Sequence, residues 1–198
     1  DGSLLWTYAD SNQISPDGYY DHIYALHEDD SGNIYAGGNY FQSIDDKERD
    51  LYVVKLSGEG DLRWSKKFSY FKGDLSCATV LDVSNQYVHV AGFTSFWYQE
   101  HDYLFLQLDR GNGEVRHVYR YDSPSNGEDY LSDMKVTTDG SVLITGISGD
   151  VPGRNWTTQY LSEDLVSLPE DNFHAQTFLY PNPVLRGTVL KLKGIEKG

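Results

Sequence analysis

The 198-residue chain carries 30 acidic and 16 basic side chains, and its net charge of −14 disfavours nucleic acid and anionic membrane surfaces as partners. A single cysteine excludes an intramolecular disulfide, and no apolar run of about 18 residues is present that could span a membrane as a helix. Sixteen tyrosines and 19 glycines favour strands and turns over helices.

A repeat organises most of the chain, and its clearest element is a β-rich run that ends in glycine. The three closing glycines are Gly38, Gly92 and Gly146, and successive ones lie 54 residues apart. The runs on either side keep nearly the same phase, which indicates repeated structural units of one kind.

Each of the first two repeats contains four extended runs, and the third contains the first three. A first run begins with aspartate, a polar turn leads to the glycine run, and two further runs follow after additional turns. The first kind of run occupies 21–26, 74–80 and 129–136, and the second, the glycine run, occupies 33–38, 87–92 and 141–146. The third kind occupies 50–56, 102–108 and 155–161, and the fourth occupies 60–64 and 113–117. Residues 2–6 match the fourth kind, so we expect the sequence to start on the last strand of an earlier unit.

Four short strands in about 50 residues are typical of a β-propeller blade. The sequence therefore predicts an all-β fold of four-stranded antiparallel blades, a partial propeller over 1–161. The expected units are 20–73, 74–128 and 129–161, with 1–19 ending a preceding blade. Because propellers typically need about four to eight blades, these units require further blades. The alternative is an open β-sandwich of loosely repeated hairpins.

We expect the repeat glycines to lie where backbones approach closely, near a central channel. Beyond the repeats, the acidic, proline-containing stretch 162–177 predicts a linker, and 178–198 predict the first strand of a new module. This module opens with two prolines around an asparagine, which hold the backbone extended and then turn it. The motif consists of Tyr180, Pro181, Asn182, Pro183, Val184 and the following Gly187.

This motif resembles the opening of the type IX secretion C-terminal sorting domain, a small β-sandwich on proteins exported by Bacteroidetes. The pattern at 30–38 resembles the bacterial β-propeller repeat family. These resemblances imply a secreted protein at the outer-membrane cell surface, with the type IX secretion machinery as a partner of the C-terminal domain. An ordinary linker with a Pro-Asn-Pro turn is the alternative for the motif.

No catalytic or cofactor site is recognisable, and we expect no metal. The acidic turn at 29–33 could offer oxygen ligands to calcium, but it lacks a suitably placed glutamate, and the same residues suit a hairpin turn. The histidines occupy different positions of the repeat without metal-site spacing; they are His22, His27, His89, His101, His117 and His174. No Ser/His/Asp set sits in a nucleophile-elbow context.

Several acids could perform glycosidic acid–base chemistry, although in so acidic a chain most form a solvated face. They are Asp46, Asp50, Glu59, Asp102 and Asp109. Aromatic side chains after the second strand could stack on sugars or pack between blades, and packing is favoured. They are Tyr40, Phe41, Phe93, Phe96, Trp97 and Tyr98.

Gly-x-x-x-Trp runs at 2–6 and 60–64 resemble those of quinoprotein propellers, in which the tryptophan docks neighbouring blades. Cys77 is expected to be a small core residue. The function that these observations indicate is a cell-surface propeller scaffold that binds a protein or glycan and performs no chemistry. The alternatives are part of a propeller hydrolase or lyase and a rigid spacer of a surface adhesin.

Overall fold

A computed structural model of the protein describes residues 2–9, 21–41, 49–68, 74–96, 100–123, 127–149, 155–161 and 177–178. These residues form twelve strands and no helix, which confirms the all-β prediction. Within these ranges there is accordingly no helix of the length and apolarity needed to cross a membrane.

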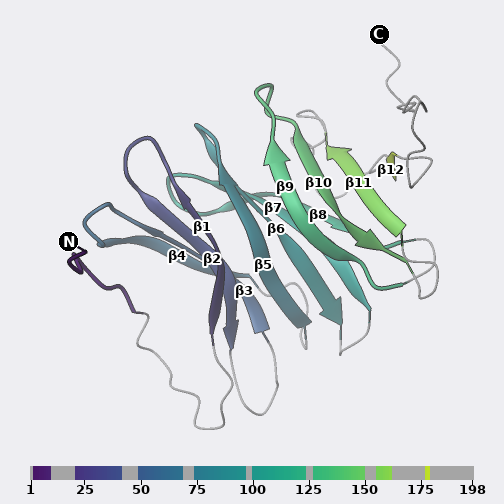
Figure 1. Ribbon diagram of the computed structural model, residues 1–198, viewed down its shortest axis with the longest axis horizontal. Helices are drawn as coiled ribbons and strands as arrows, with labels where there is room; N and C mark the ends of the chain where they lie inside the picture. Colours follow the sequence, from purple (N-terminus) through teal and green to yellow (C-terminus); the bar gives the residue numbers. More distant parts are fainter. Residues whose placement is uncertain are drawn as a thin grey trace.

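The strands form three antiparallel meanders that stand side by side in chain order, with β1, β5 and β9 as neighbouring first strands (Figure 1). A short parallel pairing of β3 with β5, with Arg49 opposite Leu75, joins the first two meanders into one eight-stranded sheet, and the third forms a four-stranded sheet. The first meander contains β1 His22–Glu28, β2 Ile34–Phe41, β3 Arg49–Leu56 and β4 Leu62–Phe68. The second contains β5 Asp74–Val83, β6 Tyr87–Phe96, β7 His101–Asp109 and β8 Val115–Tyr121. The third contains β9 Tyr130–Val136, β10 Val142–Ser148, β11 Asn155–Leu161 and β12 Thr177–Phe178.

The second meander is buried on both faces, because alternate side chains of its strands pack against the meanders on either side. Its contact with the first meander includes Leu51, Val53, Ala78, Leu81, Val88, Val90, Leu104 and Leu106. Its contact with the third includes Ala91, Tyr103, Phe105, Leu131, Met134, Val142 and Ile144. This two-sided burial explains why β7 reads as a nearly continuous apolar run rather than as an alternating one.

The three repeat glycines lie inside β2, β6 and β10 rather than at the strand ends where the sequence analysis placed them. A methyl group on Gly38, Gly92 or Gly146 would overlap the carbonyl oxygen of His22, Cys77 or Tyr130 on the neighbouring first strand. In each meander a β-bulge interrupts the register at this point. The bulge pushes a backbone carbonyl toward the second strand, and only glycine leaves room for it.

Tryptophans of the fourth runs lie on glycines of the following meander. The Trp6 ring lies against Gly60, and its indole N–H donates to the Gly58 carbonyl at 2.9 Å. Trp64 lies against Gly113 in the same way and donates to the Arg110 carbonyl at 3.3 Å. Residues 2–9 therefore stand toward the first meander as β4 stands toward the second.

The third meander gains its short fourth strand from a later part of the chain than expected. Thr177–Phe178 pair with β11, whereas the sequence analysis assigned a linker up to residue 177 and a new module from 178. The acidic composition of 162–177 hid this strand, because it lacks the apolar alternation seen elsewhere. The motif from Tyr180 to Gly187 lies outside the described residues.

Candidate functional site

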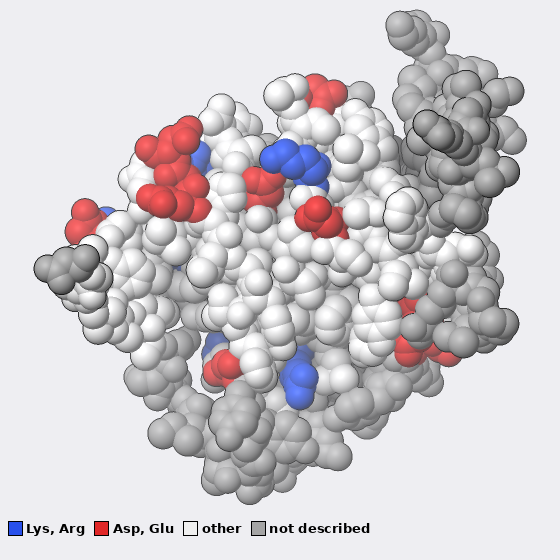
Figure 2. Space-filling model, in the orientation of Figure 1, with Lys and Arg blue, Asp and Glu red and all other residues white. Residues whose placement is uncertain are grey.

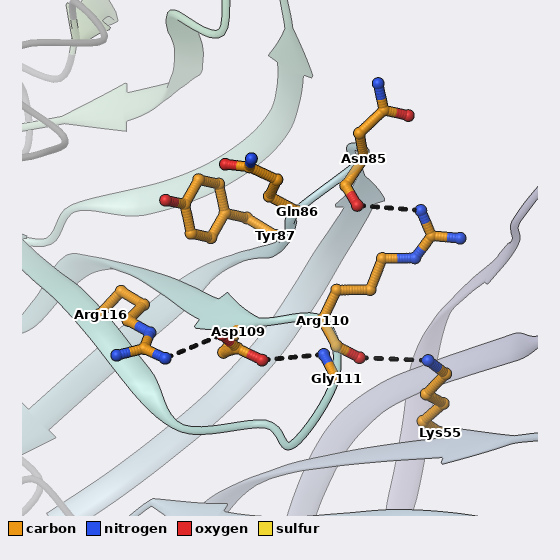
Figure 3. A pocket seen from close by; sticks show the side chains of 8 residues that line it. All are labelled: Lys55, Asn85, Gln86, Tyr87, Asp109, Arg110, Gly111 and Arg116. Carbon is orange, nitrogen blue, oxygen red and sulfur yellow. Dashed lines mark hydrogen bonds and ion pairs between the residues drawn. The ribbon is translucent and has the colours of Figure 1, made fainter.

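A pocket of about 610 Å³ opens at one edge of the second meander (Figure 3). We call it the rim pocket, and its lining residues are Lys55, Asn85, Gln86, Tyr87, Asp109, Arg110, Gly111 and Arg116. They come from the β5–β6 turn, the β7–β8 turn and the ends of the adjoining strands, with Lys55 added from β3. The pocket therefore depends on the packing of two successive meanders.

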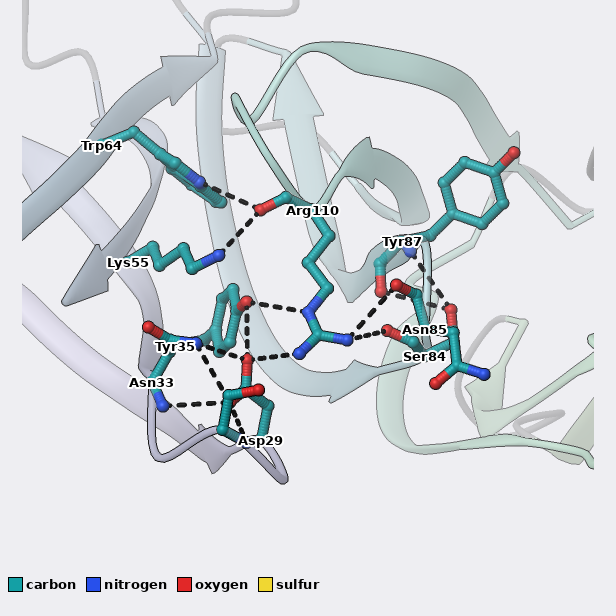
Figure 4. A network of polar contacts seen from close by, with 10 residues as sticks. Asp29, Asn33, Tyr35, Lys55, Trp64, Ser84, Asn85, Tyr87 and Arg110 are labelled. Carbon is teal, nitrogen blue, oxygen red and sulfur yellow. Dashed lines mark hydrogen bonds and ion pairs between the residues drawn. The ribbon is translucent and has the colours of Figure 1, made fainter. Parts of the chain in front are cut away.

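Arg110 forms one wall of this pocket and joins the first two meanders (Figure 4). Its guanidinium lies 2.6 Å from the Asp29 carboxylate in the β1–β2 turn and donates to the Tyr35 hydroxyl at 3.2 Å. It also donates to the carbonyl oxygens of Ser84 and Asn85, at 3.3 and 3.2 Å. Arg110 is thereby fixed from both sides of the interface.

The Asp29 carboxylate, in the acidic turn at 29–33, is saturated by hydrogen-bond donors. It accepts the backbone N–H groups of Ser31 and Asn33, each at 2.9 Å, and the Tyr35 hydroxyl at 3.1 Å. Although burial alone would raise the pKa of Asp29, the hydrogen bonds from Asn33, Arg110 and Ser31 lower it well below its usual range. This arrangement fits the hairpin-turn role of the segment.

Lys55 and Trp64 hold the backbone of the β7–β8 turn, which contains Arg110. Both donate to the Arg110 carbonyl, Lys55 at 3.1 Å and Trp64 at 3.3 Å. The Lys55 ammonium lies 5.2 Å from the centre of the Tyr35 ring. Burial and the nearby Arg110 charge lower the pKa of Lys55. The floor of the rim pocket is thus a rigid polar network.

The mouth of the rim pocket carries side chains suited to a polar ligand. Arg116 pairs with Asp109 at 2.8 Å, and Asp109 accepts the Gly111 N–H at 2.9 Å. The Tyr87 ring and the Gln86 side chain lie across the pocket from this pair, and Asn85 lies near the Arg110 guanidinium (Figure 3). None of the residues that line it is a serine, cysteine or histidine.

Three carboxylates gather at the opposite end of β7, where oxygen atoms of Asp102, Asp122 and Asp129 lie within 4.8 Å of one another. Burial and the adjacent carboxylates raise the pKa of Asp102 to about 6, although Arg120 pairs with it. Burial also raises the pKa of Asp129, which accepts the N–H groups of Ser123 and Gly149. Arg120 and these N–H groups already serve two of the three acids.

The structure disperses the acids that the sequence analysis grouped. Asp102 belongs to the cluster just described, and Asp109 lies at the rim pocket at the other end of the same strand. Asp50 is buried, Glu59 is exposed in the β3–β4 turn, and Asp46 lies outside the described residues. The histidines do not converge either: His27 faces Asp82, His101 bonds Glu128 at 2.7 Å, and His174 lies outside the described residues.

The aromatic side chains after the second strands mostly pack. Tyr40 is buried beside Tyr52 and under Lys67, and Phe41 is buried too. Phe93 lies edge-on to His101 with their ring centres 4.8 Å apart. The side chains of Phe96, Trp97 and Tyr98 lie outside the described part. Cys77 is a buried free thiol whose pKa burial raises to about 12.

The rim pocket itself escaped the sequence analysis. Asp29 and Arg110 stand 81 positions apart and occupy different positions of the repeat, so no spacing rule pairs them. The one usable signal was an arginine in a turn where the preceding repeat carries Gly58. Comparison with known proteins found no matching family model and no matching curated protein.

Proposed function

We propose that the three meanders are consecutive blades of a β-propeller that binds a glycan in the rim pocket at the bacterial cell surface. Support for the propeller comes from three recurring features: four-stranded meanders in series, a glycine opposite a bulge in each, and a fourth-run tryptophan against the next meander. Such identical stacking is what successive blades require.

The uncovered side of the first meander supports further blades. Leu81 and Met134 are buried by the meander that precedes theirs, whereas Leu26, which holds the same register position in β1, is 71% exposed. Ile23 is likewise 48% exposed, while its counterpart Ala78 is fully buried. Figure 2 shows one broad side of the molecule across all three meanders, with most charged side chains toward the strand ends and uncharged side chains between. A preceding four-stranded blade, with 2–9 as its outer strand, is the partner that fits the uncovered side of the first meander.

The observation that carries the glycan assignment is the composition of the rim pocket. A tyrosine ring offers a stacking surface for the apolar face of a sugar, and planar amide, carboxylate and guanidinium groups bond its hydroxyls in fixed directions. Tyr87, Gln86 and the Asp109–Arg116 pair supply these groups around one opening. A preformed pocket of about 610 Å³ is large enough for a ligand of one or two sugar rings.

Export to the surface is the part of the proposal that rests on the motif from Tyr180 to Gly187. Its resemblance to the type IX sorting domain makes the secretion machinery the expected partner. The test is to fuse a reporter to the natural polypeptide that contains 178–198 and to measure its export. Export is compared with that of a variant in which Pro181 and Pro183 are replaced by alanine. Export that persists unchanged in the variant would remove this support.

A glycan array followed by calorimetry on the best ligand tests the binding role. We expect binding that falls at least tenfold, about 1.4 kcal/mol, in Tyr87→Ala and in Arg116→Ala. Trp156→Ala, which removes an exposed ring on β11 away from the pocket, is the matched control and should bind normally. An array without a specific ligand contradicts the proposal, and turnover of a glycan that Asp102→Asn abolishes would support the hydrolase alternative instead.

A further inference from the structure

A second pocket, of about 350 Å³, lies between the second and third meanders on the other side of the β5–β6 turn. Its lining residues are Ser84, Asn85, Gln86, Tyr87, His89, Gln107, Val136, Thr137, Thr138, Asp139 and Gly140. It shares Asn85, Gln86 and Tyr87 with the rim pocket. The two pockets therefore flank one turn.

The corresponding space between the first two meanders is filled. There, Tyr35 pairs across the strands with Lys55, and Lys55 pairs with Trp64. These large side chains, together with Arg110, form the network of Figure 4. Each polar end of these side chains meets a hydrogen-bond partner.

At the next interface the same row of positions carries smaller side chains. His89 pairs across the strands with Gln107, and Gln107 pairs with His117. Replacing a tyrosine by histidine and a lysine by glutamine at matched register positions removes side-chain volume. The second pocket lies against the space that this exchange leaves.

His89, which is among the residues that line this pocket, has an unused hydrogen-bonding atom. Its side chain is 1% exposed, and its Nε2 lies 3.1 Å from the Ser84 hydroxyl. Because that hydroxyl donates to the Tyr87 carbonyl, the Nε2–H of His89 donates to Ser84, and Nδ1 is left as an acceptor. Nδ1 has no partner in the described part of the chain, and burial lowers the pKa of the ring to about 4, so the ring is neutral.

We propose that this second pocket binds a neutral polyhydroxylated group, a sugar or polyol, with one hydroxyl donating to Nδ1 of His89. A buried acceptor without a donor destabilises the protein, and a ligand hydroxyl that donates to it would remove this cost. The Gln107 amide offers a second contact, and the Asp139 carboxylate at the opening disfavours anionic ligands. The inference rests on the proposed function for the source of the sugar, a glycan that extends from the rim pocket across the β5–β6 turn.

Nitrogen NMR of the intact chain with labelled histidine tests the inference, with glucose, galactose, mannose and sorbitol as probes. We expect a saturable shift of the His89 Nδ1 resonance with at least one probe, and a weaker response to glucuronate. The double variant His89→Tyr, Gln107→Lys reproduces in this pocket the pair Tyr35 and Lys55 of the first interface. It should fold but lose affinity for that probe. Arg116→Ala should keep the shift, because Arg116 lines only the rim pocket.

The absence of any saturable shift up to about 0.1 M probe, where even millimolar binding would saturate, overturns the inference. The inference is also overturned if calorimetry shows that the folded double variant binds the probe with unchanged affinity. Loss of array binding in Arg116→Ala together with no shift at His89 would separate the two proposals, because the rim pocket would then stand alone.

Discussion

The guanidinium of Arg110, in the β7–β8 turn, lies 2.6 Å from the carboxylate of Asp29, in the β1–β2 turn of the preceding meander. Asp29 is almost completely buried, so this ion pair crosses the interface of two successive repeat units. It fixes the relative position of two turns and one wall of the rim pocket at once.

Arg110→Met should destabilise the protein by about 3 kcal/mol, because it leaves the buried Asp29 charge without its cation. The free energy of unfolding in urea measures this loss. Arg116→Met, which breaks the exposed pair with Asp109, is the control and should leave stability nearly unchanged. Equal effects of the two substitutions would show that the Arg110 pair does not hold the interface.

Gly92→Ala should cost about 3 kcal/mol or prevent folding, because the new methyl group would overlap the Cys77 carbonyl at the bulge. Gly111→Ala meets only the end of the Asp109 side chain and serves as the control. Thermal melts of both variants decide the matter. A Gly92→Ala protein as stable as the control would mean that the close approach is unimportant.

The repeat could be read from the sequence because its glycines and turns are local features with a constant spacing. The position of each glycine opposite a bulge could not be predicted from the sequence, because the bulge depends on pairing between strands. The partnership of Asp29 with Arg110 and the gap beside His89 arise where two meanders meet. Both features depend on residues that differ between repeats, and a search for repeated sequence does not detect such differences.

Trp64→Ala should destabilise the protein by about 3 kcal/mol, since the indole is 8% exposed and lies against Gly113 of the next meander. Trp156→Ala removes an indole that is 67% exposed and should have little effect. Urea unfolding of both variants compares them. Similar stabilities would contradict a docking role for the fourth-run tryptophans.

Stability between pH 6 and 4 should depend on two opposing groups. Burial lowers the pKa of His89 from 6.5 to about 4, so the unfolded chain takes up this proton first and about 3 kcal/mol is lost as pH falls through that window. Burial raises the pKa of Asp102 from 3.8 to about 6, so the folded protein takes up that proton first and gains stability as pH falls.

Single substitutions separate the two contributions. Relative to the wild type, Asp102→Asn should lose stability more steeply from pH 6.5 to 4.5, and His89→Gln less steeply. Chemical unfolding of the three proteins at both pH values provides the comparison. If the three slopes were the same, the burial of these two groups would not govern the acid response.

The exposure of residue 26 in the natural polypeptide tests most directly whether these meanders are successive propeller blades. Thiol labelling of Leu26→Cys measures this exposure. Tyr24→Cys is the control, because residue 24 lies at the bulge and its counterpart in the third meander, Ser132, is exposed although another meander precedes it. The account predicts that the residue 26 thiol is protected while the residue 24 thiol reacts. Rapid labelling of both, at the rate of the unfolded chain, would contradict it.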